Sequence, residues 1–461
     1  MSSDTSPAKP LSSGLNFQLS TMMFLQYAIW GAWLPLLWTF LSGHRDFTPA
    51  EIGNMFAIGA VGAIVAPFIA GQIADRWFNT EKFLGISHIL GGILVWQLAS
   101  LETYNSFLIF SLLYSLIYSP TLSLTNSLAF HHLPDRDRDF GKIRVWGTIG
   151  WIAVGIGIGQ WLLYQHTPTG VEAEAVSAAQ AAGMADAFKL SGLLGIVMGV
   201  FCFFLPSTPP AKEEKKSAIS GAMNAIRLQP LLTLFLIAVP ISCVHQFYFV
   251  HTAPFLGQFQ NQAEGFINIV NKIVGVGGGG LMTIGQMAEI GVLALIPLFA
   301  KKYSRKALLC VGIAAYALRM FLFAYGPNFT EILQLPAIIL GISMHGLCFG
   351  CFIFVAFMVV DEECAVDVRA SAQSLFNLVI VGIGIIVGSK VAGYVAEIST
   401  VNEVMNYQKL FSVPMWAALA CLVIMQLCYP NKPPATDADG PSDKDADLDI
   451  DSDAASNNGD E

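Results

Sequence analysis

Glu289 puts a carboxylate inside an apolar stretch of the chain. The stretch runs from Val274 to Ala300 and, apart from Gln286, contains almost nothing else that prefers water. If this stretch crosses a bilayer, a charge near its middle costs on the order of 3 kcal/mol on insertion scales. Chains that keep such a charge usually use it to contact a solute, an ion or a proton, so Glu289 is a candidate functional residue.

Gln286 and Glu289 are three residues apart, which makes them neighbours on one face of a helix. Both side chains offer acceptors and the amide also donates, so the pair can hold two adjacent hydroxyls of a sugar or the edge of a base. The alternative is a structural pair between helices, in which Glu289 meets Arg319 or Arg144. The residues themselves leave both interpretations open.

Arg144, Thr148 and Trp151 form a second group of polar and aromatic residues. At about 100° per residue they fall within about 60° of one another on a helix. One face then carries a cation, a hydroxyl and an aromatic plate, which suits a flat polar ring: the indole can stack, and the guanidinium can reach carbonyl or hydroxyl oxygens. In the alternative, Arg144 only extends to the membrane interface and Trp151 anchors in lipid.

The composition indicates an all-α membrane protein. Hydrophobic residues make up 54% of the chain and charged residues 12%, with a mean hydropathy of +0.58, whereas soluble proteins carry about 25% charged residues. About twelve apolar runs are long enough to cross about 30 Å of hydrocarbon as helices. These spans are expected near residues 17–42, 51–74, 83–101, 105–131, 143–165, 186–206, 229–256, 268–300, 307–325, 334–360, 370–396 and 408–429. The eighth run could contain a loop around Gly277 to Gly280, and the first lacks the cleavage site of a secretory signal.

The charge pattern predicts that both termini are cytoplasmic. Lysine and arginine concentrate in the loops that would share one side with the N-terminus, as the positive-inside rule requires. These residues are Arg76, Lys82, Arg136, Arg138, Lys142, Lys212, Lys215, Lys216, Arg227, Lys301, Lys302, Arg305 and Lys306. In the opposite loops, Arg45 and Lys409 are the clear exceptions.

The chain is expected to divide into two halves of six helices each. Residues 17–206 and 229–430 would form the halves, joined by a cytoplasmic linker over 207–228 and preceded by a cytoplasmic tail over 1–16. Repeated halves of this kind occur in secondary transporters, with the solute site between them at mid-membrane depth. Residues 431–461 hold ten acidic residues against two lysines and few large apolar residues, so a disordered, solvated tail is expected. Span counting alone also allows a channel or a membrane enzyme.

Two further features argue against other chemistry. The eight cysteines lie in apolar runs or at their edges without paired spacing, so neither disulfides nor a metal site is expected. The glycine run Gly275 to Gly280 is not preceded by a strand or followed by Gly-Lys-Ser/Thr, so it does not predict nucleotide hydrolysis. We therefore expect no enzyme, no metal and no cofactor.

Several motifs resemble a known family of membrane proteins. The segment Gly71-Gln-Ile-Ala-Asp-Arg-Trp77 resembles the signature loop of the major facilitator superfamily. More specific similarity, to the nucleoside:proton symporter family of bacterial nucleoside and xanthosine permeases, covers roughly residues 17–430. It rests on the segments Phe24–Trp33, Pro120–Asn126, Ile143–Trp151, Leu318–Gly326 and Arg369–Gln373.

This resemblance implies a transporter of the cell inner membrane that imports nucleosides by proton symport through alternating access. By the same resemblance, the solute would contact Arg144, Thr148, Trp151, Gln246, Gln286, Glu289 and Phe349. Glu289 would also carry the proton, because moving it toward or away from a cation would change how tightly the proton is held. The expected partners are a small solute, a proton and the lipid bilayer, with no nucleic acid, and the chain is expected to act as a monomer.

The sequence departs from the family pattern at two positions. Phe249 stands where related permeases usually carry an amide, and Gly350 stands where the better-known members carry an acid. Each change removes a polar contact, so a proton-coupled symporter of a sugar or another polyhydroxylated solute is the alternative. A membrane sensor that transports nothing is a further alternative, which the buried charges disfavour. Weaker site candidates, each more easily explained as a core or paired residue, are His245, His251, His345, Arg319 and Lys390.

Overall fold

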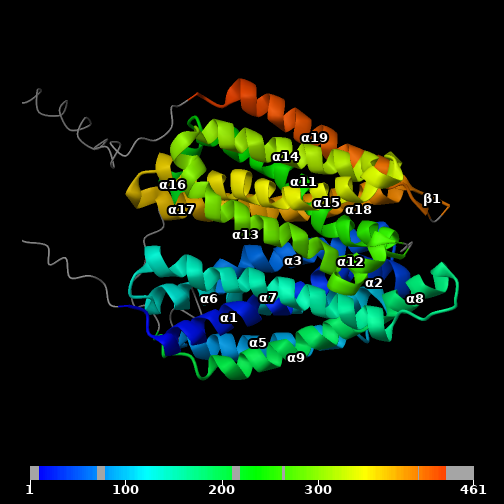
Figure 1. The fold of residues 1–461 in the computed structure, drawn as a ribbon. Coiled ribbons are helices and arrows are strands. Elements are labelled where there is room, and N and C mark those ends of the chain that lie inside the picture. Colours follow the sequence, from blue (N-terminus) through cyan, green and yellow to red (C-terminus); the bar gives the residue numbers. More distant parts are fainter. Residues whose placement is uncertain (1–9, 70–77, 210–218, 262–264, 403, 432–461) are drawn as a thin grey trace, which may run out of the picture.

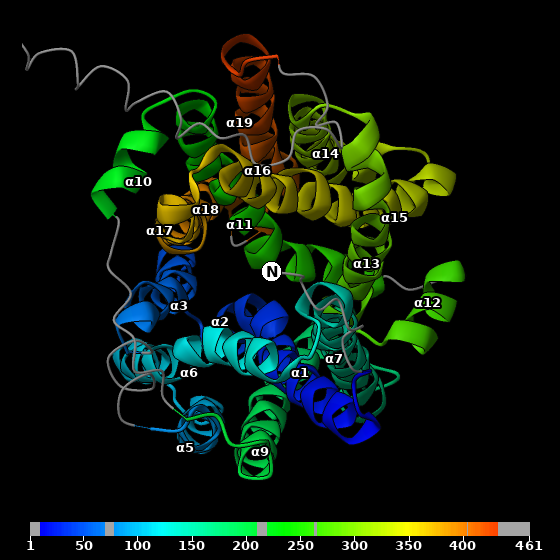
Figure 2. The same cartoon turned by 90° about the vertical axis from the view of Figure 1, so that its left-hand side faces the viewer.

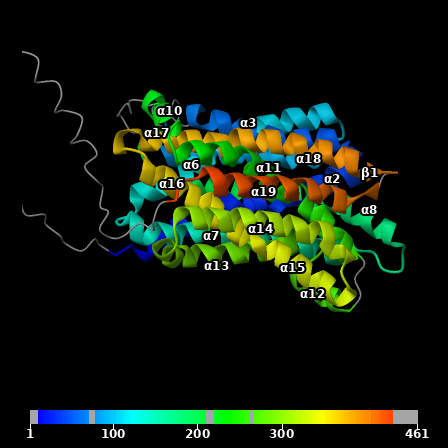
Figure 3. The same ribbon diagram turned by 90° about the horizontal axis from the view of Figure 1, so that it is seen from above.

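The computed structural model describes residues 10–69, 78–209, 219–261, 265–402 and 404–431 of the 461-residue chain. Within these residues the fold is a bundle of long helices that run along one axis, with one short antiparallel pair of strands at its edge (Figures 1 and 3). The first and last described residues, 10 and 431, lie at the same end of the bundle (Figure 1). We call this the terminal end and the opposite one the far end.

The helices form two groups that lie on either side of the bundle (Figures 1 and 2). The first group contains α1 (Ser13–Trp33), η1 (Leu34–Leu36), α2 (Leu37–His44), α3 (Pro49–Ile69), α5 (Thr80–Leu98), α6 (Tyr104–His132), α7 (Arg136–Gln165), α8 (Ala173–Gly183) and α9 (Ala185–Cys202). The second contains α10 (Ile219–Ile226), α11 (Leu231–Asn261), α12 (Phe266–Val274), α13 (Gly279–Lys302), α14 (Arg305–Tyr325), η3 (Gly326–Asn328), α15 (Glu331–Leu347), η4 (Cys348–Phe354), α16 (Val355–Glu363), α17 (Val366–Asn377), η5 (Leu378–Gly384), α18 (Ile385–Ser399), β1 (Thr400–Val401), β2 (Val404–Met405) and α19 (Tyr407–Cys428).

The predicted membrane spans correspond to helices in the structure. Within the described part of the chain, 11 helical segments are long and apolar enough to cross a membrane. They coincide with the predicted runs except the one at 83–101, where the structure has the helix α5. The fold is that of a multi-pass α-helical membrane protein, and the count of twelve spans stays a prediction.

The long eighth run is interrupted, as the sequence suggested. Helix α12 ends at Val274 and α13 begins at Gly279. Between them, Gly275, Gly277 and Gly278 have φ values of 79°, 84° and 81°. Side chains rarely tolerate this left-handed region, so glycine is what lets the chain leave one helix and start the next. The break therefore falls before Gln286 and Glu289 and leaves both on one uninterrupted helix.

Several predicted segments lie outside the described residues. They are the signature loop at 71–77, residues 1–9 of the first tail, the charged centre of the linker at 210–218, and the acidic tail from 432 onward. The described part of the linker region includes α10, which packs against α17.

The two groups of helices are joined at the far end. There α7 packs against α12 and α13, and α3 packs against α18. The backbone N–H of Val276 donates to the carbonyl of Gly159 over 3.0 Å, and the Gln160 side chain donates to the carbonyl of Lys272 over 2.9 Å. The Asn261 side-chain amide also donates to the Ser177 hydroxyl across the groups, over 2.9 Å. The bundle is therefore closed there.

Candidate functional site

Helix α7 presents the three predicted residues of the first group. The Arg144 guanidinium lies over the ring of Tyr27 from α1, 4.1 Å from the ring centroid. Trp151 is 9% exposed and meets Trp30 edge to face, with 6.0 Å between ring centroids, and Thr148 is half-buried one turn before it. Because Trp151 packs against another ring inside the protein, it does not have the surroundings of a lipid anchor.

The aromatic wall depends on close contact between α1 and α7. A Cβ at Gly150 would lie 2.2 Å from the carbonyl oxygen of Phe24, so a side chain at this position would separate the two helices. Glycine therefore brings Trp151 within reach of Trp30. Trp30 in turn approaches Tyr118 of α6 at 6.3 Å between ring centroids, which extends the wall to a third helix.

Behind this wall lies a buried polar network that closes on itself, which we call the Gln26 network. The Gln26 amide donates to the Thr121 hydroxyl over 2.9 Å, and its oxygen pairs with His88 Nε2 over 2.9 Å. The Tyr118 hydroxyl donates to the backbone carbonyl of Gln26 over 2.5 Å. Each bond joins different helices of the first group, so the network fixes the position of the aromatic wall.

The second group of helices contributes Gln286 and Glu289 from α13. Gln286 is 5% exposed, and within the described residues its side-chain oxygen has no hydrogen-bond partner. The Glu289 side chain keeps 15% of its surface exposed. Its Oε2 lies 3.4 Å from Nε2 of His345 on α15, so the side chain in polar contact with Glu289 is this histidine rather than either arginine considered from the sequence.

Arg319 stands on the other side of His345. Its Nη1 is 3.1 Å from His345 Nδ1, and the arginine is fully buried. The guanidinium lies 4.3 Å from the ring centroid of Tyr248 and 5.0 Å from that of Tyr316. Cation–π contacts contribute about 2 kcal/mol or more when they are shielded from water. Arg319, His345 and Glu289 thus form a continuous line, which we call the Arg319 line.

The two sides of the site act on each other through charge. Arg144 of α7 is near enough to Glu289 of α13 for direct Coulomb attraction, and the helices α7 and α13 are in contact. The structure therefore brings together the two residue groups that the sequence had identified separately. It also gives Glu289 two cations, one acting directly from the first group and one through His345.

Gln246 and Phe349 occupy different surroundings. Gln246 of α11 is 5% exposed and packs against α18, where a Cβ at Gly388 would be 2.9 Å from its own Cβ. Phe349 is half-buried in the π-helical stretch η4, with its ring 6.5 Å from that of His345. Single turns of π-helix are frequent at functional sites because they re-aim side chains. Phe349 thus adjoins the Arg319 line.

The two departures from the family pattern lie on α11 and η4. The ring of Phe249 is 5.1 Å from that of His245 and 6.1 Å from that of His345, so an apolar edge takes the place of an amide. A Cβ at Gly350 would be 2.7 Å from Cγ1 of Val292. The space that an acid would need at Gly350 is therefore filled from α13.

The remaining sequence candidates divide between the site and other places. His245 bonds the Tyr316 hydroxyl over 2.6 Å and so supports the Arg319 line from α11. The ring of His251 meets that of Trp38 on α2, 4.4 Å between centroids, which joins the two groups away from the line. His251 also bonds the carbonyl of Ala392 within its own group. Lys390 is exposed on α18.

Sequence reasoning identified the charged residues but missed how they connect. It gave His345 only a minor role and did not select Tyr27, Trp30 or Tyr248. The available signal was the density of aromatic residues around Trp30 and around Tyr248. That signal does not say which rings meet, because the partners lie on different helices.

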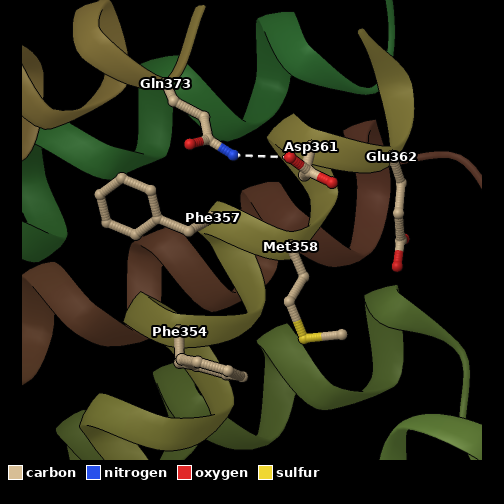
Figure 4. A pocket seen from close by; sticks show the side chains of 6 residues that line it. All are labelled: Phe354, Phe357, Met358, Asp361, Glu362 and Gln373. Carbon is tan, nitrogen blue, oxygen red and sulfur yellow. Dashed lines mark hydrogen bonds between the residues drawn. The ribbon is translucent and has the colours of Figure 1, made fainter. Parts of the chain in front are cut away.

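A pocket of about 300 Å³ opens on η4, α16 and α17 toward the terminal end (Figure 4). Three apolar side chains, Phe354, Phe357 and Met358, face its interior, and Gln373 donates to Asp361 over 2.8 Å at its rim. Glu362 completes the lining. No predicted site residue lines this pocket, which lies on the continuation of the helix that carries Phe349.

Known transporters and permeases of nucleosides are similar to this chain over most of its length. The model of the family described as nucleoside H+ symporter matches residues 13–433. The putative nucleoside transporter YegT of Escherichia coli (strain K12) is 34% identical over 388 residues, which cover 82% of this chain and 84% of that protein. The xanthosine permease of the same strain is 28% identical over 417 residues, covering 88% of this chain and 94% of the permease.

A solved structure shares the arrangement of helices. The crystal structure of the nucleoside transporter NupG superimposes with a TM-score of 0.76 at 25% sequence identity, covering 91% of this chain and 100% of that one. The fold is that of the major facilitator superfamily. The predicted fold class is therefore confirmed.

Proposed function

The chain belongs to the nucleoside H+ symporter family, and we propose that it imports a nucleoside together with a proton by alternating access. It is a multi-pass membrane transporter. The observation that carries the proposal is that α7, which carries Arg144 and Trp151, packs against α13, which carries Gln286 and Glu289, where the two groups of helices meet. One side of that meeting point offers an aromatic wall and the other a carboxylate, which are the chemistries that a base, a ribose and a proton need.

In the proposed site, the base stacks on Trp151, whose own ring is supported by Trp30. The side-chain oxygen of Gln286 accepts a hydrogen bond from a base edge or a ribose hydroxyl. Arg144 and Thr148 contact the solute from α7, and Gln246 and Phe349 from the second group. Glu289 binds the transported proton.

The proposed cycle uses the far end as a gate. The bond between Val276 and Gly159 and the contacts around it close this end. The charge pattern supports cytoplasmic termini in the inner membrane, and the state described here is then closed to the outside. Opening would require these bonds to break while the terminal end closes, after which Glu289 could take up a proton from outside. We propose that the transporter acts as a monomer, with no nucleic-acid partner.

Solute accumulation in proteoliposomes tests the proposal. The intact protein is supplied with labelled uridine, adenosine, xylose or maltose, with and without an inward proton gradient. We expect a nucleoside to accumulate above its outside concentration only while the gradient is present, and the sugars not to accumulate. If a sugar accumulates and no nucleoside does, the alternative of a sugar symporter, which Phe249 and Gly350 favour, replaces the proposal.

A matched pair of variants tests the aromatic wall and its cation. Arg144→Ala should raise the KM for nucleoside uptake at least tenfold, because it removes the cation that α7 supplies to the proposed solute site. Lys142→Ala removes an exposed cation two residues earlier on the same helix and should leave the KM unchanged. Equal effects of the two substitutions would show that Arg144 acts only through the general charge of α7.

A further inference from the structure

We infer that Arg319 fixes His345 in a single tautomer whose N–H faces Glu289, so that His345 and Arg319 are positioning residues for proton coupling. This inference rests on the proposed proton symport. Glu289 then binds the transported proton, and His345 does not. No residue of the Arg319 line other than Glu289 then changes its charge during transport.

The tautomer follows from the chemistry of the two bonds. A guanidinium has only N–H donors and no acceptor. In the 3.1 Å contact between Arg319 Nη1 and His345 Nδ1, the arginine must therefore donate and Nδ1 must accept. The proton of the neutral imidazole is then on Nε2, the atom that lies 3.4 Å from Glu289 Oε2. A small approach would complete a hydrogen bond to the carboxylate.

The same geometry keeps His345 from carrying a proton. A second proton would have to bind Nδ1, where it would point at the N–H groups of Arg319. Two donors facing each other beside a permanent positive charge are unfavourable. His345 can therefore donate to Glu289 only as a neutral ring.

Packing holds the imidazole in this orientation. His345 is 2% exposed, and its ring stacks on that of Tyr248 with centroids 4.7 Å apart and an angle of 15°. Phe249 meets its edge at 6.1 Å. A ring held on its face and its edge cannot turn away from the carboxylate without disturbing α11, so the donor stays aimed at Glu289.

The charge of Arg319 explains why the line matters for coupling. Within the described residues, Arg319 forms no ion pair with a carboxylate, and its Nε and Nη2 have no hydrogen-bond partner. Glu289, beyond His345, provides a negative charge on the same line. When Glu289 loses its proton the line becomes neutral overall, and when Glu289 binds one a buried cation is left without an opposite charge. Arg319 and His345 thereby favour release of the proton.

Five further titratable groups act on this line from the helices around it. They are Arg144 from α7, His245 and Tyr248 from α11, Tyr316 from α14 and Cys348 from η4. Arg144 is the cation that comes from the opposite group of helices. It is therefore the one whose distance from Glu289 changes when the two groups move, whereas Arg319 moves together with Glu289.

Two substitutions of His345 separate a positioning role from a proton-carrying role. In His345→Gln, the amide oxygen can accept from Arg319 and the amide N–H can donate to Glu289, but the side chain cannot titrate. In His345→Phe, the ring shape remains without either nitrogen. Both are compared with wild type in proteoliposomes, by nucleoside accumulation under a proton gradient and by nucleoside exchange without a gradient, each from pH 5.5 to 8.5.

We expect His345→Gln to keep at least half of the accumulation and an unchanged pH profile. We expect His345→Phe to lose accumulation at least tenfold while exchange continues, and Arg319→Met to behave in the same way. If His345→Gln fails as His345→Phe does, with exchange intact, the imidazole itself carries the proton and the inference is overturned. If His345→Phe accumulates nucleoside like wild type, the line has no role in coupling.

An independent readout covers the case in which His345→Phe does not transport at all. Infrared difference spectra of the purified protein report the protonated carboxyl band that Glu289→Gln removes. This band should persist to higher pH, by about one pH unit, in His345→Phe but not in His345→Gln, because loss of the donor favours the protonated acid. An unshifted band in His345→Phe contradicts the inference. Absence of gradient-driven accumulation by wild type would instead count against the proposed function.

Discussion

The Gln26 network and the Arg319 line are both buried polar networks, one in each group of helices. In the Gln26 network the amide, imidazole and hydroxyl groups bond one another across helices and carry no net charge. In the Arg319 line a guanidinium, an imidazole and a carboxylate follow one another, and nitrogens of Arg319 remain unpartnered within the described residues. The first uses its hydrogen bonds to hold a wall, and the second keeps a charge that can change.

This difference explains why the two sides of the site need different residues. Stacking a base requires rings held at a fixed spacing, and a neutral, satisfied network provides that without responding to pH. Proton coupling requires a group whose charge state depends on what lies nearby. Separating the tasks lets one side stay fixed while the other switches.

Glu289→Gln should have the largest effect, because it removes the switching charge. We expect a loss of gradient-driven nucleoside accumulation of at least tenfold, with exchange between the two sides of the membrane still measurable. Glu397→Gln, an exposed carboxylate on α18, serves as the control and should not change accumulation. Full accumulation by Glu289→Gln would show that the proton binds elsewhere. The Arg319 line would then not be the network whose charge changes during transport.

Gly350→Asp tests whether the missing acid can be restored on η4. The new side chain would meet Cγ1 of Val292, and overpacking of this kind costs about 1–3 kcal/mol before the cost of a buried charge is added. We expect a clear fall in the thermal unfolding temperature of the purified protein. Val292→Ala in the same chain should recover part of that fall.

Gly291→Ala is the matched control for this experiment. A Cβ at Gly291 meets nothing within 4 Å, and alanine favours a helix over glycine by about 1 kcal/mol. Its unfolding temperature should stay level or rise. If Gly350→Asp is as stable as wild type, α13 must be able to move away from η4.

Trp151→Ala should weaken nucleoside binding without changing proton coupling. Stacking of a base on an aromatic side chain contributes about 1–3 kcal/mol, so the Kd measured by calorimetry should rise roughly 5- to 150-fold. Trp151→Phe keeps a ring and should have a smaller effect. An unchanged Kd for Trp151→Ala would place the base away from the aromatic wall.

Thr121→Val changes the Gln26 network rather than the Arg319 line, and it should have the smallest effect. It removes the acceptor of the Gln26 amide at a fully buried position, which costs about 1 kcal/mol of stability. Thr125→Val is the control, because the Thr125 hydroxyl bonds only its own helix. The ratio of protons to nucleosides transported should stay constant in both variants, and a change in Thr121→Val would mean that the Gln26 network takes part in coupling.

Much of this protein was predictable from local features of the chain. The helical spans follow from apolar runs, and the break before α13 follows from its glycines. The positions of Arg144, Thr148 and Trp151 on one face, and of Gln286 near Glu289, follow from helical periodicity. These properties depend on residues close together in sequence, so a single sequence is sufficient to derive them.

The partner of Glu289 could not be derived in this way. The residues suggested a pair with Arg319 or Arg144, whereas the structure inserts His345 between Glu289 and Arg319. His345, Arg319 and Glu289 lie on three different helices. Which of their atoms meet depends on how those helices rotate and slide against one another, and close packing of many side chains sets that arrangement.

The amino-acid sequence by itself determined that this is a helical membrane chain with a costly carboxylate on α13 and an aromatic, cationic face on α7. Its hydropathy and helical periodicity are enough for that, because the bilayer imposes helices on apolar runs. Only the tertiary structure decided that α13 packs against α7, which carries Arg144, and that His345 stands between the carboxylate and Arg319. Contacts between distant helices have no local signature, since the same apolar surfaces allow many registers until the whole bundle packs.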